Sequence, residues 1–342
     1  MIDTVHAVGT YLIDLLERME LPHDPGSVRE VLEHASGGQL NTKRGDGRQA
    51  STLTLSGLPF EASVTGGRGR TTRAVRYVTE PATQETTFES RLTAQRIAVG
   101  ELVRRLASGG DETTGLFRSL IEYVHPEPAL VPTWYSGSTF IGVVYRDMAA
   151  LPVSGIKVYC GPLRSPAALE GLCRQLPGFA GLATVPEEGR PLLRPLLATL
   201  EANALGEVVY KVYMSVRPHI ATPMKLVRYF GDPAWEILSE LVACGADPTA
   251  LHRYHYFICR ARGPGASTLT LNPLALGDID LTEVTRELAT RHHGSTHAVD
   301  AMAAAARAVG AAWHYSALGV GFSADHGIDK LNVYGVPIWS AG

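Results

Sequence analysis

Hydrophobic side chains recur along this chain with two different periods. In segments such as 87–108, apolar residues return every three or four positions, which is the spacing of an amphipathic helix. In others apolar and polar residues alternate, as expected of a strand with two unlike faces. The helical period predicts helices over 4–22, 26–35, 87–108, 112–124, 166–176, 189–204, 232–244, 247–252, 281–293 and 297–311. Alternation and turn residues predict strands over 51–65, 72–80, 137–146, 153–161, 207–217, 223–230, 253–262, 266–272, 313–323 and 328–338.

The order of these elements is itself a repeat. Two helices followed by two strands occur five times, with a period of roughly 65 residues. Strands joined by short turns pair as antiparallel hairpins, and a sheet of five hairpins loses its free edges only by closing on itself. The apolar faces of the helices must then cover the outside of the sheet. The sequence therefore predicts an α+β fold, a ten-stranded antiparallel β-barrel surrounded by helices, as a single domain over 1–342.

Composition and charge exclude several classes of partner. With 342 residues, 45% of them hydrophobic, the chain can bury a large core, and its net charge of −3 argues against nucleic acid or an anionic membrane as a partner. The first twenty residues lack the features of a signal peptide, and no apolar stretch reaches the length of a membrane span. We therefore expect a cytoplasmic protein, a monomer or a weak homodimer.

Nothing in the sequence predicts a bound metal ion. The four cysteines lack the spacing of a metal site, and no Asp-rich motif occurs. His292, His293 and His297 lie between two predicted helices and are interpreted as a linker. We expect no metal site and no cofactor.

Basic and aromatic residues alternate on several predicted strands and so share one face of each. These sets are Lys157 with Tyr159, Lys211 with Tyr213, Ser215 and Arg217, Lys225 with Tyr229, and Lys330 with Asn332 and Tyr334. Buried cations need counter-charges, and these strands contain few carboxylates. A diphosphate would supply the charge, while tyrosine faces stabilise a nearby cation by ~0.5–2 kcal/mol each. This combination is what heterolysis of an allylic diphosphate requires.

Five segments resemble motifs of a known family. They are GLPFEASV (57–64), VRYVTEP (75–81), IKVYCGP (156–162), MKLVRYF (224–230) and KLNVYGVP (330–337). Their order is similar to that in the ABBA fold, or prenyltransferase barrel, and in particular to its indole branch of the dimethylallyltryptophan-synthase type, in a bacterial form.

The resemblance implies a role for each matching residue. Glu61 would contact the indole N–H of the acceptor. The diphosphate would be bound by Arg76, Lys157, Lys225 and Lys330, and the allyl cation would be shielded by Tyr159, Tyr229 and Tyr334. Further contacts are assigned to Lys211, Tyr213, Arg217 and Asn332.

The sequence departs from the family pattern at two places. Val227 stands where the motif has a basic residue, and the strand 267–274 has Thr268, Thr270 and Asn272 in place of a tyrosine. Glu61 also has an alternative partner, because Arg73 or Arg76 of its own hairpin would form a salt bridge with it.

The implied activity is a metal-independent transfer of a dimethylallyl or longer prenyl group from its diphosphate to an indole-containing acceptor, in secondary metabolism such as alkaloid biosynthesis. Two alternatives stay open. The acceptor would be a peptide side chain or a phenolic or polycyclic molecule, or the barrel would bind an anionic ligand without catalysis.

Overall fold

The computed structural model describes residues 4–45, 47, 49–67, 71–106, 110–125, 138–147, 153–163, 165–182, 192–216, 219–274 and 279–339. Within these residues the α-helices are α1 (Thr4–Arg18), α2 (Pro25–Ser36), α3 (Phe88–Val103), α4 (Asp111–Val124), α5 (Pro166–Gln175), α6 (Thr222–Phe230), α7 (Asp232–Ala243), α8 (Thr282–His292) and α9 (His297–Ala308). The strands are β1 (Phe60–Gly67), β2 (Thr71–Thr79), β3 (Ser138–Arg146), β4 (Gly155–Gly161), β5 (Leu193–Asn203), β6 (Val208–Val216), β7 (His255–Arg262), β8 (Leu269–Leu274), β9 (Ala312–Ser323) and β10 (Gly327–Ile338).

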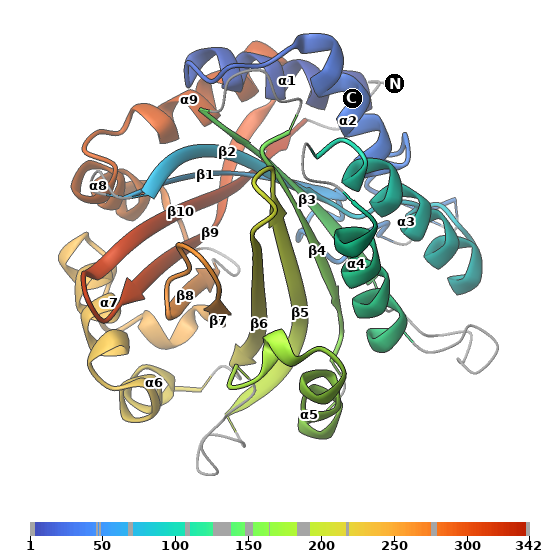
Figure 1. Cartoon of the computed structure of the whole chain (residues 1–342). Helices are drawn as coiled ribbons and strands as arrows, with labels where there is room; N and C mark the ends of the chain where they lie inside the picture. Colours follow the sequence, from blue (N-terminus) through green and yellow to red (C-terminus); the bar gives the residue numbers. More distant parts are fainter. Residues whose placement is uncertain are drawn as a thin grey trace.

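The ten strands form one closed antiparallel barrel, which confirms the predicted fold. Each strand pairs with its neighbours in sequence, and β1 pairs with β10 to close the sheet. Figure 1 shows the strands at the centre of the molecule and the helices around them. Closure leaves no free sheet edge, because every strand has a hydrogen-bonded neighbour on both sides.

The helices cover the outer face of the barrel, because each has one apolar side. Helix α1 buries Tyr11, Leu12 and Leu16, all 0% exposed, in the layer between helices and sheet. The strands contribute outward-facing residues such as Val64 and Val158 to this same layer. The hydrophobic core therefore forms a ring outside the barrel, which leaves the inner face of the strands free to line a cavity.

No helix in the described part of the chain is both long and apolar enough to cross a membrane.

Two predicted elements have the wrong type. Segment 189–204 was predicted as a helix, but its described part forms strand β5 (Leu193–Asn203). Its leucines and alanines favour a helix in isolation. Pro195 within the segment is a helix breaker, and the alternation of buried Leu200 with polar Thr199 and Glu201 is that of a strand.

Segment 223–230 was predicted as a strand but forms helix α6. Pro223 lies in its first turn and Gly231 at its C-cap, the usual signals for the start and the end of a helix. Thr222 and Leu226, one turn apart, are its buried residues. The third hairpin is therefore β5–β6, and the number of hairpins is preserved although two elements were exchanged.

Two further boundaries also differ. The first strand starts at Phe60 instead of residue 51, because 51–59 form turns. The predicted helix 247–252 is reduced to the 3₁₀ turn η4 (Leu251–Arg253).

Candidate active site

A cavity of about 510 Å³ lies inside the barrel and is lined by alternate residues of its strands. The strand register explains the convergence. Lys157 of β4 pairs directly with Glu201 of β5, and Tyr159 pairs with Thr199, which in turn pairs with Lys211 of β6. Residues that pair across antiparallel strands lie on the same face of the sheet, so these side chains all project inward.

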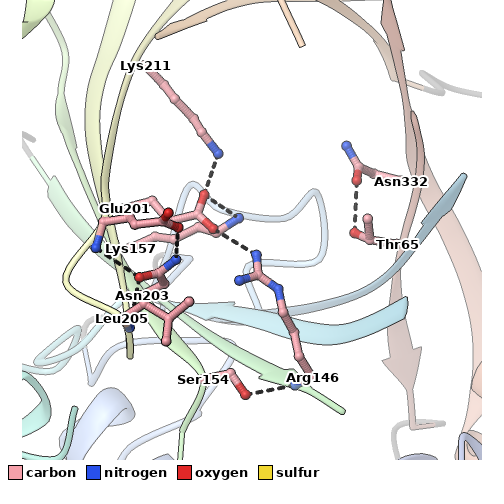
Figure 2. A network of polar contacts seen from close by, with 10 residues as sticks. Thr65, Arg146, Ser154, Lys157, Glu201, Asn203, Leu205, Lys211 and Asn332 are labelled. Carbon is pink, nitrogen blue, oxygen red and sulfur yellow. Dashed lines mark hydrogen bonds and ion pairs between the residues drawn. The ribbon is translucent and has the colours of Figure 1, made fainter. Parts of the chain in front are cut away.

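Three basic side chains surround one buried carboxylate in this cavity. Glu201 Oε2 lies 3.2 Å from Lys157 Nζ and 2.5 Å from Lys211 Nζ, and its Oε1 lies 3.4 Å from Arg146 Nη2. Figure 2 shows the carboxylate between these cations, which come from β3, β4 and β6. Lys157 and Lys211 hold the pKa of Glu201 well below its ordinary value, even though burial by itself would raise it.

Two further cations line the cavity on the strands beside β1. Arg76 of β2 is only 7% exposed, and its Nε and Nη2 atoms are buried without a hydrogen-bond partner among the described residues. Its guanidinium lies 5.8 Å from the ring centre of Tyr334. Burial and the nearby cations, Lys211 first, lower the pKa of Lys330 to about 8. Buried donors of this kind point to an anionic ligand, since an unpaired buried charge is costly.

Tyrosines form the wall next to the cations. The rings of Tyr159 and Tyr213 lie 5.9 Å apart, and Tyr334 lies on β10 with the guanidinium of Arg76 over its ring. Burial raises the pKa of all three phenols, so their hydroxyls stay neutral. Their faces present negative quadrupole charge to the cavity.

Glu61 lies on β1, two residues before Ser63, which pairs with both Arg76 and Tyr334. Glu61 is half-buried and is not itself among the residues that line the cavity, but its charge interacts with Arg76 and Tyr334, which do line it. Burial raises its pKa to about 7, against the opposing effects of a hydrogen bond from Ser316 and of the charge of Arg76. The Ser316 hydroxyl donates to Glu61 Oε1 at 2.6 Å.

The contact between Ser316 and Glu61 depends on an irregularity in the sheet. The β9–β10 register shifts between Tyr334 and Gly335, so Ser316 has no paired residue on β10. Such a bulge changes the direction of a side chain. Regular alternation would therefore not identify Ser316.

Most of the predicted site residues line this cavity. Those are Arg76, Lys157, Tyr159, Lys211, Tyr213, Lys330, Asn332 and Tyr334. Asn332 accepts a hydrogen bond from the Thr65 hydroxyl, and the tyrosine-free strand β8 contributes Thr270 and Asn272 to the wall. The alternative salt bridge of Glu61 with Arg73 or Arg76 is not formed among the described residues, although the charge of Arg76 acts on Glu61.

Lys225 and Tyr229 lie on helix α6 and not on a barrel strand. The prediction that they lie on a barrel strand and face the cavity is wrong, because α6 carries both on the outside of the barrel. Val227, which was matched to the basic position of the same family motif, also lies on α6, so that comparison does not apply to the barrel wall. The spacing of that motif also occurs at Val209, Lys211 and Tyr213 on β6, whose side chains do line the cavity. Arg217 lies outside the described residues.

Sequence reasoning missed Arg146, Glu201 and Ser316. Glu201 was not recognised because a helix was predicted over its segment. Thr199, Glu201 and Asn203 nevertheless alternate as polar positions, as on one face of a strand. Arg146 ends a strand that was predicted correctly, but nothing in the sequence shows that it reaches across β4 to Glu201.

The described residues contain no group of three or more His, Cys, Asp or Glu side chains able to hold a metal ion. Of the histidines interpreted as a linker, His292 is instead the last residue of α8, His293 is its C-cap and His297 is the first residue of α9. The Nε2 atom of His292 lies 2.9 Å from Glu240 of α7.

No protein-family model matches the sequence. No curated protein matches it either. Solved structures do match. The 5-dimethylallyltryptophan synthase from Streptomyces coelicolor superimposes with a TM-score of 0.72 at 18% sequence identity, over 96% of each chain. The 6-dimethylallyltryptophan synthase from Micromonospora olivasterospora, solved with DMASPP and Trp, gives 0.72 at 16% identity, over 98% of this chain and 97% of that chain.

A more distant match is AnaPT from Neosartorya fischeri, with a TM-score of 0.62 at 13% identity over 96% of this chain and 91% of that chain. All three similarities extend over nearly the whole chain, helices included. This chain therefore has the fold of the dimethylallyltryptophan synthases, the prenyltransferase barrel that its sequence motifs predicted.

Proposed function

We propose that this protein is an aromatic prenyltransferase that moves a dimethylallyl group from its diphosphate to an indole-containing acceptor. The observation that carries the proposal is the composition of the one cavity described above, inside the barrel. Five basic side chains gather at one part of its wall, which are Arg76, Arg146, Lys157, Lys211 and Lys330, and three tyrosines stand beside them. Similar barrels were solved with DMASPP and Trp.

The basic side chains would bind the donor through its diphosphate. Arg76 offers two buried donors that have no partner in the described part of the chain, and Lys157, Lys211 and Lys330 have ammonium groups in the same cavity. Charge-assisted hydrogen bonds to the phosphate oxygens stabilise the negative charge that grows as the carbon–oxygen bond breaks. The donor site thus takes its positive charge from side chains, and we propose that catalysis needs no metal ion.

The tyrosines would stabilise the allyl cation, which is the other product of carbon–oxygen bond cleavage. Tyr159, Tyr213 and Tyr334 surround the space next to the cations, where the allyl cation would form. Their faces stabilise it, and their bulk excludes water that would otherwise capture it. Positioning of the acceptor ring against the allyl carbon supplies much of the remaining acceleration.

Glu61 would orient the acceptor. Its Oε1 is occupied by Ser316, which leaves Oε2 to accept the indole N–H. The aromatic carbon attacks the allyl carbon, the new carbon–carbon bond forms, and the ring then loses the proton of the attacked carbon. With a pKa near 7, Glu61 is suited to receive that proton, either directly or through water.

An assay of donors against acceptors tests the proposal. The protein is incubated with dimethylallyl or geranyl diphosphate and with tryptophan, a Trp-containing dipeptide or a naphthol, with and without EDTA. We expect diphosphate release that depends on the acceptor, a prenylated indole by mass spectrometry, and no effect of EDTA. Diphosphate binding without any turnover would instead support the anionic-ligand barrel, and prenylation of the naphthol alone would move the acceptor class to phenols.

We further propose that residues 1–342 act as one barrel domain in the cytoplasm. The pairing of β1 with β10 joins the first and the last strand in one sheet, which supports this unit.

A further inference from the structure

Glu201 is a buried acid among cations, and the mechanism above gives it no role. Its side chain is 10% exposed, and it contacts Lys157, Lys211 and Arg146, whose side chains are 6%, 11% and 28% exposed. Taking a carboxylate out of water is costly unless several partners compensate it. Glu201 has three partners, one from each of β3, β4 and β6.

Contact with Glu201 uses only part of the hydrogen-bonding capacity of the two lysines, so their ammonium groups can also bind a second anion. An ammonium group has three N–H donors, and Lys157 and Lys211 each direct one toward Glu201 Oε2. The remaining donors belong to side chains that line the open cavity. Glu201 thus fixes both ammonium groups at one point on the wall, much as an outer carboxylate fixes a ligand of a metal site.

Lys157 depends most on this partner. It is faced by Lys211 of β6, Arg76 of β2 and Lys330 of β10, and Arg146 of β3 contacts the same carboxylate. Burial lowers the pKa of Lys157 well below its ordinary value, and these cations lower it further. Glu201 is the acid that opposes them and raises it.

We propose that Glu201 is a positioning residue of the donor site, which keeps Lys157 charged and holds Lys157 and Lys211 directed at the diphosphate of the donor. This inference rests on the proposed function, because it assigns the ligand of the two lysines. The inference gives a negatively charged residue a role in a site that binds an anion. It predicts that, in a variant without the Glu201 carboxylate, donor binding weakens as the pH rises.

The test measures the dissociation constant of inorganic diphosphate by titration calorimetry at several pH values. The wild type is compared with Glu201→Gln, which removes the charge and keeps the shape, and with Glu201→Asp, which keeps the charge at shorter reach. Glu170→Gln is the matched control, because Glu170 is an exposed carboxylate on the outer helix α5 and does not line the cavity. The ratio of variant to wild type cancels the ionisation of diphosphate itself.

For Glu201→Gln we expect diphosphate binding to weaken relative to the wild type as the pH rises, by about tenfold for each unit by which the loss of Glu201 lowers the pKa of Lys157. Glu201→Asp should show the same trend at about threefold, which keeps the test decisive should the glutamine variant not fold. A ratio that is constant with pH for both variants, or tighter binding throughout, would overturn the proposal. Absence of diphosphate binding by the wild type would instead contradict the proposed function.

Discussion

Replacing Glu61 by glutamine should stabilise the protein and inactivate it at the same time. Burial raises the pKa of Glu61 from 4.5 to about 7, so the folded protein holds the ionised form less well than the unfolded chain does. At 1.36 kcal/mol per pKa unit, this difference corresponds to at most about 3 kcal/mol. Glutamine keeps the shape and the hydrogen bond from Ser316 but is never charged.

The sign of the effect follows from the two pKa values. Below about pH 4.5 the carboxyl is protonated in both states, and Glu61 costs nothing. As the pH rises from there to about 7, Glu61 loses its proton in the unfolded chain but still holds it in the folded protein, so the free energy of unfolding decreases. Above that value the difference is constant. The stability gained by Glu61→Gln should therefore be small near pH 5 and reach about 2–3 kcal/mol near pH 8.

Urea unfolding of both proteins at about pH 5 and about pH 8 measures this difference. Glu170→Gln, on an exposed residue of α5, serves as the control and should follow the wild type at both values. In the assay of turnover, the wild-type rate should rise as the pH passes through about 7, and Glu61→Gln should lack this rise and be slower by roughly 10²–10⁴-fold. Parallel stability curves for variant and wild type would refute the burial of an ionisable carboxyl at this position.

Three further substitutions test other parts of the site. Arg76→Gln should weaken binding of inorganic diphosphate by roughly 10–100-fold, since each charge-assisted hydrogen bond contributes about 1.5–3 kcal/mol, and an unchanged dissociation constant would remove Arg76 from the donor site. Tyr334→Phe should keep turnover close to wild type, whereas Tyr334→Leu should lower it by about 3–30-fold through loss of the aromatic face, and equal rates for both would argue against cation shielding. Lys157→Ala should weaken diphosphate binding, while Lys225→Ala on the outer helix α6 should change neither binding nor stability by more than about 0.5 kcal/mol. A large loss of binding in Lys225→Ala would show that α6 contributes to the donor site.

The sequence predicted the barrel well because closure depends on a pattern that is present in every hairpin. Alternation placed Lys157 with Tyr159 and Lys330 with Tyr334 on one face each, and all four line the cavity. Position along the strand was enough to identify them, since side chains two residues apart must point the same way.

Short segments were less reliable, because seven or eight residues fit both periods. In 223–230 the residues Lys225, Val227 and Tyr229 alternate like a strand, while Thr222 and Leu226 are spaced like a helix. The capping residues Pro223 and Gly231 decide between the two, and they favour the helix. Segment 193–203 was predicted as a helix and 223–230 as a strand, which is the reverse of the structure. For this reason Glu201 was not assigned to a barrel strand.

Contacts between distant strands were beyond the reach of the sequence. Arg146 and Glu201 are 55 positions apart and meet only because β4 lies between β3 and β5 in the closed sheet. Ser316 reaches Glu61, 255 positions away, only because β9 carries a bulge. Neither the order of strands around a barrel nor the position of a bulge is encoded in local periodicity.

Closure of the barrel also decides which charges meet. Arg76 of β2 and Lys330 of β10 stand on the two strands that flank β1, the strand of Glu61, while Lys157 and Lys211 belong to β4 and β6. An open sheet ending at β1 and β10 would separate Arg76 and Lys330 by its full width. The antiparallel pairing of β1 with β10 therefore does more than remove two sheet edges, because it brings Arg76 and Lys330 into the same cavity as Lys157 and Lys211.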